Sequence, residues 1–437
     1  MDELARYDSN SGVLRCLLVC IGLTLVLRLG WAAVMPFDLE SDERAYFTFA
    51  SHLSQGEGYG WEPHKPSAYW PVGTSALYAA VFMLTGPGKL GVVLVNLAAS
   101  SAMTGLAVLL ARRWFGGKFG APSMWAAGLL FAAWPTSVMF ATVLNSELVF
   151  GAVLMWVLLA LATPEPPTLR RWLLAAPLLA CLAYTRPTGL LVGPILACVH
   201  VARLSPPFAI GPSIRTLGFG VAATAVMLAC IAPWTYRNYQ AFDDFALIST
   251  NGGPVFWMGN NPDTDGTYMS LPDSVEGMSE TERASMLKKE AWAYVRDDPA
   301  AFVTRSIKKL AMTHTTETIG VAWNQTSLER RFGEDNSNRL IEPGLKAIGS
   351  AFWLGTLGLG GVGWVLLWRS VGFWRAFTHP TLVMWVYFAG VHAIVLAQDR
   401  YHLQWSPMVM LLASVSLATL WNRVRSGGRP EYRALGG

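Results

Sequence analysis

Residues 13–53 read VLRCLLVCIGLTLVLRLGWAAVMPFDLESDERAYFTFASHL, an apolar run followed at once by a cluster of acids. The apolar part, 13–36, is long enough for a membrane-spanning helix, which needs about 20 largely apolar residues. Four carboxylates then fall within six positions, at Asp38, Glu40, Asp42 and Glu43. Ionisable groups at the mouth of a membrane bundle are costly unless they are solvated or functional, so this cluster is a candidate site.

The composition places the whole chain in the membrane class. Of its 437 residues, 53% are hydrophobic and only 14% are charged, whereas a soluble domain carries about 25% charged residues. The net charge of +4 is small, and the basic residues gather in particular loops. This pattern indicates membrane orientation and argues against nucleic-acid binding, which would show a basic face or stripe.

Hydrophobic length and loop charge together predict the topology. Short cytoplasmic loops are enriched in Lys and Arg, and the basic loops alternate correctly here only if the short segment 73–86 does not cross the bilayer. We therefore predict an all-α polytopic membrane protein of about ten transmembrane helices, with interfacial helices in the first outer loop, one larger outer loop and both termini cytoplasmic. The ten crossing segments are 13–36, 90–111, 121–141, 147–163, 172–185, 188–204, 216–234, 346–368, 380–397 and 403–421.

The predicted organisation has four parts along the chain. An N-terminal transmembrane catalytic module, 1–235, includes the outer loop 37–89. The large extracytoplasmic loop 236–345 follows, then the C-terminal transmembrane helices of 346–421 and a basic cytoplasmic tail, 422–437.

Local signals place helices inside the large outer loop. Ser279 and Glu282 have the spacing of a capping box, which predicts a helix start, and a second helix is expected after Pro299. Both helices alternate apolar and basic faces, as helices resting on a membrane surface do. The TRPTG break between 172–185 and 188–204 predicts half-helices at a cavity, where irregular backbone is tolerated at membrane depth.

Three carboxylates are candidate catalytic groups. Asp42 or Glu43 could act as a general base that deprotonates an acceptor hydroxyl as it attacks a sugar carbon. The alternative is a solvated loop acid or the N-cap of a helix over 44–54. Glu147, in the outward-facing NSE turn, could be a second acid of the site or part of the N-cap of the next span.

An aromatic stretch in the first outer loop is a candidate substrate-binding element. In HKPSAYWPVG, Lys65 could hold a phosphate, and Tyr69 could stack on a sugar ring. The alternative is an aromatic belt at the membrane interface.

Three outward arginines at span ends indicate a shared anionic ligand. Arg186 faces outward against the positive-inside trend, and a guanidinium matches the oxygens of a phosphate; snorkelling to the lipid headgroups is the alternative. Arg237, in PWTYRN, is the second, and Arg400, beside Tyr401 in DRYHLQWSP, is the third. Each arginine alone would be an ordinary interfacial residue.

Taken in order, these motifs resemble the polytopic class C glycosyltransferases, in particular the branch that contains lipid A aminoarabinose transferase and the protein O-mannosyltransferases. The landmarks are SDERAY, KPSAYWPVG, WPTSVMFATVLNSE, TRP, PWTYRNY with STNGG and GNNP, RDDPAAFVTRSIKKL and DRYHLQWSP, between residues 13 and 421. The resemblance implies transfer of a sugar from a polyprenyl-phosphate carrier to a hydroxyl or phosphate of an acceptor, with inversion, at the outer face of the membrane.

The resemblance also implies roles for individual residues. Asp42 matches the family's base, with Glu43 beside it, and Glu147 matches the second acid turn. Arg186 lies where members often carry a basic residue near the carrier phosphate; Arg237 and Arg400 match less closely. Members often carry a large folded domain after the last span, which this sequence does not show, so the loop 236–345 is expected to recognise the acceptor.

The sequence also leads to expectations about a metal cofactor, binding partners and cellular location. We expect no required metal, although some class C enzymes use one and Asp38, Glu40 and Asp42 could supply oxygen ligands. The expected partners are a polyprenyl-phosphate sugar donor, the lipid bilayer and a glycan, lipid or protein acceptor, with no nucleic acid. The expected location is a bacterial inner membrane with the site facing the periplasm.

Two other functions remain open at this stage. An O-antigen-type polymerase or ligase also has many spans and a large arginine-bearing outer loop, but it usually lacks the acidic pair in the first outer loop. A lipid-linked sugar flippase or transporter would show internal repeats, and the interrupted pair 172–204 has no counterpart elsewhere in the chain.

Overall fold

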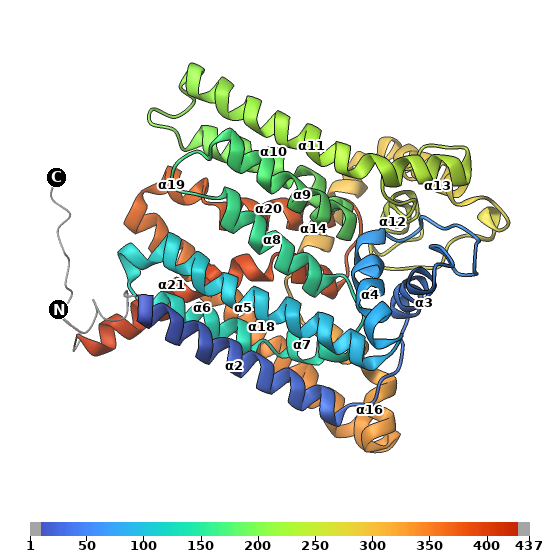
Figure 1. Cartoon of the computed structure of the whole chain (residues 1–437), viewed down its shortest axis with the longest axis horizontal. Coiled ribbons are helices and arrows are strands. Elements are labelled where there is room, and N and C mark those ends of the chain that lie inside the picture. Colours follow the sequence, from blue (N-terminus) through green and yellow to red (C-terminus); the bar gives the residue numbers. More distant parts are fainter. Residues whose placement is uncertain (1–9, 427–437) are drawn as a thin grey trace.

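The computed structural model describes residues 10–426, and the regular structure in this part of the chain is helical (Figure 1). Its longest helices lie roughly side by side in a bundle. They are α2 (Asn10–Val34), α5 (Lys89–Phe119), α11 (Ile210–Phe242), α18 (Glu342–Val371) and α21 (Ser406–Arg425). The all-α prediction is therefore confirmed.

The centre of the bundle forms around α21, which packs against α18, α5 and α6 (Pro122–Ala133). Every residue from Ser406 to Ser416 is buried, so this part of the helix is surrounded by protein on all faces, as expected at the centre of a bundle. Gly363 of α18 lies directly against the Leu412 carbonyl, where a Cβ would sit 1.9 Å from the oxygen. Glycine there permits the close approach of the two helices.

Five helices between residues 10 and 426 are long and apolar enough to cross a membrane, and a sixth is added if the bent pair around Pro135 is one span. The shorter helices between the long ones are α7 (Pro135–Met139), η1 (Phe140–Thr142), α8 (Glu147–Leu161), α9 (Leu169–Thr185), η2 (Pro187–Leu191), α10 (Val192–Ala202), α19 (Phe373–Phe377) and α20 (Pro380–Ile394). Of these, α7, η2 and α20 begin at a proline, which cannot continue the hydrogen-bond ladder of a preceding helix. The predicted break at Pro187 is present; the count of ten spans stays a prediction.

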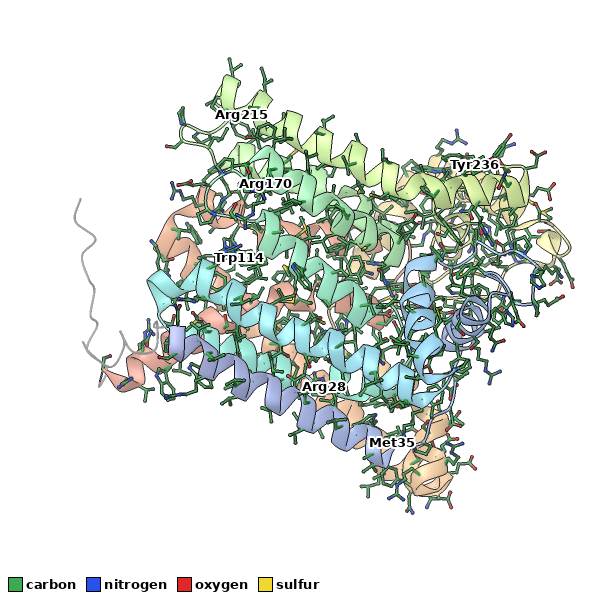
Figure 2. The ribbon with its side chains drawn as sticks, in the orientation of Figure 1. Arg28, Met35, Trp114, Arg170, Arg215 and Tyr236 are labelled. Carbon is green, nitrogen blue, oxygen red and sulfur yellow. The ribbon has the colours of Figure 1, made fainter. Side chains whose placement is uncertain are left out.

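Basic residues gather at one end of the bundle, where they cap the carboxyl ends of helices. Arg113 and Arg171 both donate to the Leu159 carbonyl, and Lys118 donates to the Ser370 carbonyl. Arg170 and Arg215 lie at this end in Figure 2, whereas Met35 and Tyr236 lie at the other.

The described ends of the chain also meet at this basic end. The Asn422 amide of α21 donates to the Phe119 carbonyl at 3.0 Å, and the first turns of α2 pack on the start of α6 in one apolar cluster. The predicted tail begins within α21, and its residues 427–437 lie outside the described part of the chain.

The opposite end carries the two outer loops. The first loop holds α3 (Asp42–Gln55) and α4 (Val72–Thr85), and the second holds α12 (Gly252–Met258), η3 (Asp273–Val275), α13 (Glu280–Asp297), α14 (Pro299–Met312), α15 (Ile319–Ala322), α16 (Gln325–Phe332), α17 (Glu334–Asn336) and η4 (Ser337–Ile341). The predicted capping box is confirmed, because Ser279 and Glu282 each bond the backbone N–H of the other.

The second outer loop packs into the bundle. Lys309 of α14 is fully buried and donates to the carbonyls of Ile394 and Gly259, at 2.9 and 3.1 Å. It thereby binds a carbonyl at the carboxyl end of α20. Beyond α20 the chain forms the short turn η5 (Asp399–Gln404) before it enters α21. The loop also contacts this turn, which carries Arg400, because the Thr318 N–H donates to Asp399 at 2.8 Å.

Candidate functional site

Asp42 and Glu43 are successive residues at the start of α3, so their side chains point in different directions from the helix. Successive residues of a helix are rotated by about 100°, whereas residues i and i+4 share a face. Glu43 is fully buried, but the Asp42 side chain retains 28% exposure. Asp42 is thus placed to meet a substrate, and Glu43 faces the protein.

Glu43 joins the first outer loop to the turn that precedes α8. Its two carboxylate oxygens accept the backbone N–H groups of Glu40 at 3.0 Å and Leu144 at 2.6 Å. Burial raises its pKa to about 8, although the two N–H donors oppose that rise. These contacts indicate that Glu43 fixes the first residues of α3, including Asp42, in place.

Asp42 forms an ion pair with Arg400 of η5. Its Oδ2 lies 2.9 Å from the Arg400 Nη1, and the Arg400 side chain is only 14% exposed. Burial alone would lower the pKa of Arg400, but the nearby charge of Asp42 holds it well above the usual arginine value. Arg400 therefore carries a fixed positive charge beside the candidate base.

Glu147 forms a second acid–arginine pair, with Arg186. Glu147 is the first residue of α8 and its side chain is 1% exposed. Arg186, at the break between α9 and η2, donates to Glu147 and, through Nε, to the Ser146 hydroxyl at 2.9 Å. The NSE turn and the TRP turn, distant in the sequence, thus meet at one point.

The Tyr401 ring connects the two pairs. The Arg186 guanidinium lies 5.8 Å from its centroid and the Arg400 guanidinium 5.3 Å, distances typical of cation–π contacts. The ring also stacks on His392 of α20, with centroids 4.3 Å apart and planes at 17°. Tyr401 is therefore held between α20 and two cations.

Tyr46 of α3 lies close to both ion pairs. The pKa of Tyr46 is raised by burial, and the charges of Arg186, Asp42, Glu147 and Arg400 all act on its hydroxyl. Tyr46 lies four residues after Asp42, on the same face of α3, so the spacing in the sequence already places it beside the candidate base.

Tyr69 approaches this region from the first outer loop. Burial raises its pKa to about 12, against the lowering effect of Arg283, and the charges of Asp42 and Tyr401 add to the rise. The Arg283 guanidinium lies 5.6 Å from the centre of the Tyr69 ring. The structure thus brings Tyr69 to the side of the site that the second outer loop covers.

The other two predicted cations contact different groups. Lys65 is 72% exposed and bonds Glu62 at 3.1 Å. Arg237 donates to the carbonyls of Ser67 and Tyr59, at 2.8 and 3.2 Å, so it supports the first outer loop. The structure brings Arg186 and Arg400 together but not Lys65 and Arg237, whose binding of a phosphate stays a prediction.

The carboxylates considered as metal ligands do not converge. Asp38 bonds Arg330 at 2.8 Å, Glu40 accepts the backbone N–H of Thr326 at 3.1 Å, and Asp42 pairs with Arg400. Among residues 10–426, no group of three or more His, Cys, Asp or Glu side chains could hold a metal ion. In the described part of the chain these three carboxylates therefore contact other residues and do not form a shared ligand set; that the protein requires no metal stays a prediction.

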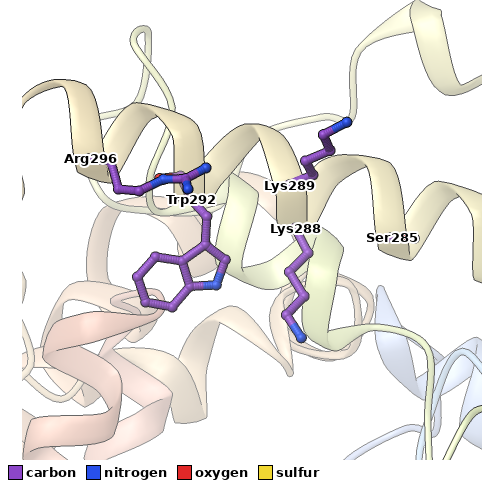
Figure 3. A pocket seen from close by; sticks show the side chains of 5 residues that line it. All are labelled: Ser285, Lys288, Lys289, Trp292 and Arg296. Atoms are coloured by element: carbon purple, nitrogen blue, oxygen red, sulfur yellow. The ribbon is translucent and has the colours of Figure 1, made fainter.

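A surface hollow of about 430 Å³ lies on α13, away from the two ion pairs. Its lining residues are Ser285, Lys288, Lys289, Trp292 and Arg296. In Figure 3, Lys288 and Trp292 extend from one side of the helix and Lys289 from the other. None of the residues of the two pairs lines this hollow, so its lysines provide charge-matched control positions for the site.

Comparison with solved structures finds the same architecture in known enzymes. AglB, the oligosaccharyltransferase of Archaeoglobus fulgidus, solved with an inhibitory peptide and a dolichol-phosphate, matches with a TM-score of 0.57 and 12% identity over 95% of this chain. ArnT from Cupriavidus metallidurans, solved with undecaprenyl phosphate, matches with a TM-score of 0.56 and 15% identity over 96%.

At 12% and 15% sequence identity, the similarity to these two enzymes is a similarity of fold. This chain spans 51% of the AglB chain and 63% of the ArnT chain. No protein-family model and no curated protein sequence matches the chain significantly.

Proposed function

Because the chain has the class C glycosyltransferase fold, we propose that it transfers a sugar from a polyprenyl-phosphate carrier to a hydroxyl or phosphate of an acceptor, with inversion at the sugar carbon. The observation that carries the proposal is the pair of acid–arginine contacts, Asp42–Arg400 and Glu147–Arg186, whose two guanidinium groups both lie near the Tyr401 ring. Solved neighbours with the same fold hold dolichol-phosphate and undecaprenyl phosphate, which supports a lipid-phosphate donor.

The proposed reaction needs a base and a stabilised leaving group. Asp42 accepts the proton of an acceptor hydroxyl while that oxygen forms a bond to the anomeric carbon. The bond from that carbon to the carrier phosphate breaks, and its electron pair leaves with the polyprenyl phosphate. Arg400 and Arg186 stabilise the negative charge that develops on the phosphate, because preorganised cations favour the charged transition state.

The two arginines are already neutralised by acids, and this has a consequence for the donor. A carrier phosphate that binds Arg400 competes with Asp42 for the same guanidinium. Binding of the donor would then free the Asp42 carboxylate to accept a proton. In this proposal the donor phosphate itself activates the base.

We propose an orientation from the distribution of charge. The end of the bundle that holds Arg113, Lys118 and Arg171 would face the cytoplasm, as the enrichment of basic residues in inner loops requires. The ion pairs lie at the other end and would face the periplasm of a bacterial inner membrane. Both chain ends would be cytoplasmic. The shorter helices α8, α9, α20 and η2 with α10 would join the long helices and the bent pair around Pro135 in a bundle of about ten spans.

The first test is acceptor-dependent release of free polyprenyl phosphate. Purified protein in lipid nanodiscs would be given a panel of polyprenyl-phosphate sugars, with and without candidate acceptors. Wild type and the control Lys288→Gln/Lys289→Gln should release carrier phosphate from one donor when the acceptor is present, and empty nanodiscs should not. Transport of the intact donor across a vesicle membrane without cleavage would contradict the proposal and support a flippase.

A further inference from the structure

Glu317 is a carboxylate inside the bundle that the proposed chemistry does not use. Its side chain is fully buried. One oxygen accepts the Trp134 Nε1–H at 2.8 Å, and the other lies 3.0 Å from the His402 Nε2. A buried ionisable group in a membrane bundle is a functional candidate, and its partner His402 lies two residues after Arg400.

Two contacts hold the His402 ring, whereas its buried Nδ1 has no hydrogen-bond partner among the described residues. Its ring stacks on Trp353 of α18 with centroids 4.3 Å apart and planes at 9°. Its carbonyl accepts the Ser406 hydroxyl at 2.9 Å. Glu317 supplies the hydrogen bond to the ring, so together with Trp353 it restrains the imidazole and, through it, η5.

The neighbouring residue Thr318 holds the other end of η5. Its backbone N–H and its hydroxyl both donate to the Asp399 Oδ2, at 2.8 and 2.7 Å. Two consecutive residues of the outer loop therefore hold Asp399 and His402. These are the residues that flank Arg400 and Tyr401 in the chain.

The same loop also contacts the guanidinium itself. Trp323, just after α15, places its ring 5.1 Å from the Arg400 guanidinium carbon. Glu317, Thr318 and Trp323 thus support Arg400 through its backbone on both sides and through its side chain. Asp42 meets Arg400 from a different element, α3.

We propose that Glu317 is a positioning residue for the anion site of Arg400. By fixing His402 it holds η5 in the path that keeps the Arg400 guanidinium beside Asp42 and the donor phosphate. The inference rests on the proposed function, because it assumes that Arg400 binds the phosphate of a polyprenyl phosphate. It extends that function by giving the second outer loop a role in donor binding as well as in acceptor recognition.

A double-mutant cycle separates this role from a general contribution to stability. The affinity of undecaprenyl phosphate for the protein in nanodiscs would be measured for wild type, Glu317→Gln, Arg400→Gln and the double variant. Glu317→Gln should weaken binding about tenfold, and the same change should have less than about a twofold effect once Arg400 is Gln, because residues that act through one contact are not additive.

The matched control is Glu342→Gln. Glu342 is also a buried carboxylate of the outer end, bonded to Ser337 and Lys346, and it has no contact with η5 among the contacts described. Its loss should leave the affinity for undecaprenyl phosphate near that of wild type. If Glu317→Gln does not fold, Thr318→Val tests the same support from the Asp399 side.

The possible results distinguish failure of the Glu317 proposal from failure of the proposed function. An equal loss of affinity from Glu317→Gln in both Arg400 backgrounds, or no loss in either, would overturn the positioning role while leaving the proposed function intact. A wild-type protein that binds no polyprenyl phosphate would overturn the proposed function, and this inference with it.

Discussion

Replacing Asp42 with Asn should strengthen binding of the carrier phosphate while it removes the proposed base. The reason is the resting ion pair: Asp42 and a phosphate oxygen compete for the same Arg400 guanidinium. Asn keeps the size of the side chain and can still accept a hydrogen bond, but it no longer offers a negative charge. Affinity and activity should therefore change in opposite directions.

The size of the effect follows from the geometry of the pair. The nitrogen–oxygen distance is 2.9 Å, and the two side chains are 14% and 28% exposed, so solvent screens the interaction in part. Such pairs contribute about 0.5–1 kcal/mol, which corresponds to a two- to fivefold tightening of binding once the competitor is neutral, at about 1.4 kcal/mol per tenfold. Arg400→Gln should instead weaken binding about 30-fold, because truncating one partner of a hydrogen-bonded charge pair costs at least about 2 kcal/mol.

The assay is equilibrium binding of undecaprenyl phosphate to protein in nanodiscs of neutral lipid, at two ionic strengths. Asp244→Asn is the control, because Asp244 is an exposed carboxylate of the same outer end that bonds only its neighbour Phe245 among the contacts described. The tightening seen with Asp42→Asn should shrink at high salt, since a Debye length of about 3 Å at 1 M screens the pair.

One result would refute the reasoning. If Asp42→Asn weakened carrier binding as much as Arg400→Gln does, Asp42 would contribute to the phosphate site itself. The proposed exchange between Asp42 and the phosphate would then be wrong.

Three further predictions test other parts of the site. Glu147→Gln should lower the midpoint of thermal unfolding, because it leaves the Arg186 guanidinium without its buried partner at a cost of about 3 kcal/mol; an unchanged midpoint would contradict a buried ion pair. Glu43 binds its proton more tightly when folded than when unfolded, since its pKa is raised from 4.5 to about 8. Its contribution to stability should thus be full below about pH 4.5 and lost as the pH rises toward 8. The midpoint temperature of thermal unfolding of wild type should therefore fall relative to that of Glu43→Gln across this pH range. A constant difference between the two midpoints would argue against the raised pKa. Glycosyl transfer should persist after dialysis against EDTA, because Asp38, Glu40 and Asp42 each have other partners; loss of activity that Mg²⁺ or Mn²⁺ restores would overturn this expectation.

The sequence predicted the helical class and several helix boundaries because those features depend on local chemistry. The capping box at Ser279 and the helix start at Pro299 follow from backbone groups within a few residues. The break at Pro187 follows from the lack of an N–H on proline. Such signals do not depend on how the helices pack.

The partners of the charged side chains were not predictable in the same way, since they depend on tertiary packing. Nothing local distinguishes Arg400, which meets Asp42, from Arg237, which binds carbonyls of the first loop. Glu317 belongs to no motif, and only the fold places it beside His402. The pairing of Glu147 with Arg186 likewise joins residues 39 positions apart.

The most direct test of the account is the release of free polyprenyl phosphate by wild type and by Asp42→Asn, with the acceptor present and absent. The account predicts acceptor-dependent release by wild type and its loss in Asp42→Asn, although that variant still binds the carrier phosphate. Equal release by both proteins would contradict the assignment of Asp42 as the base.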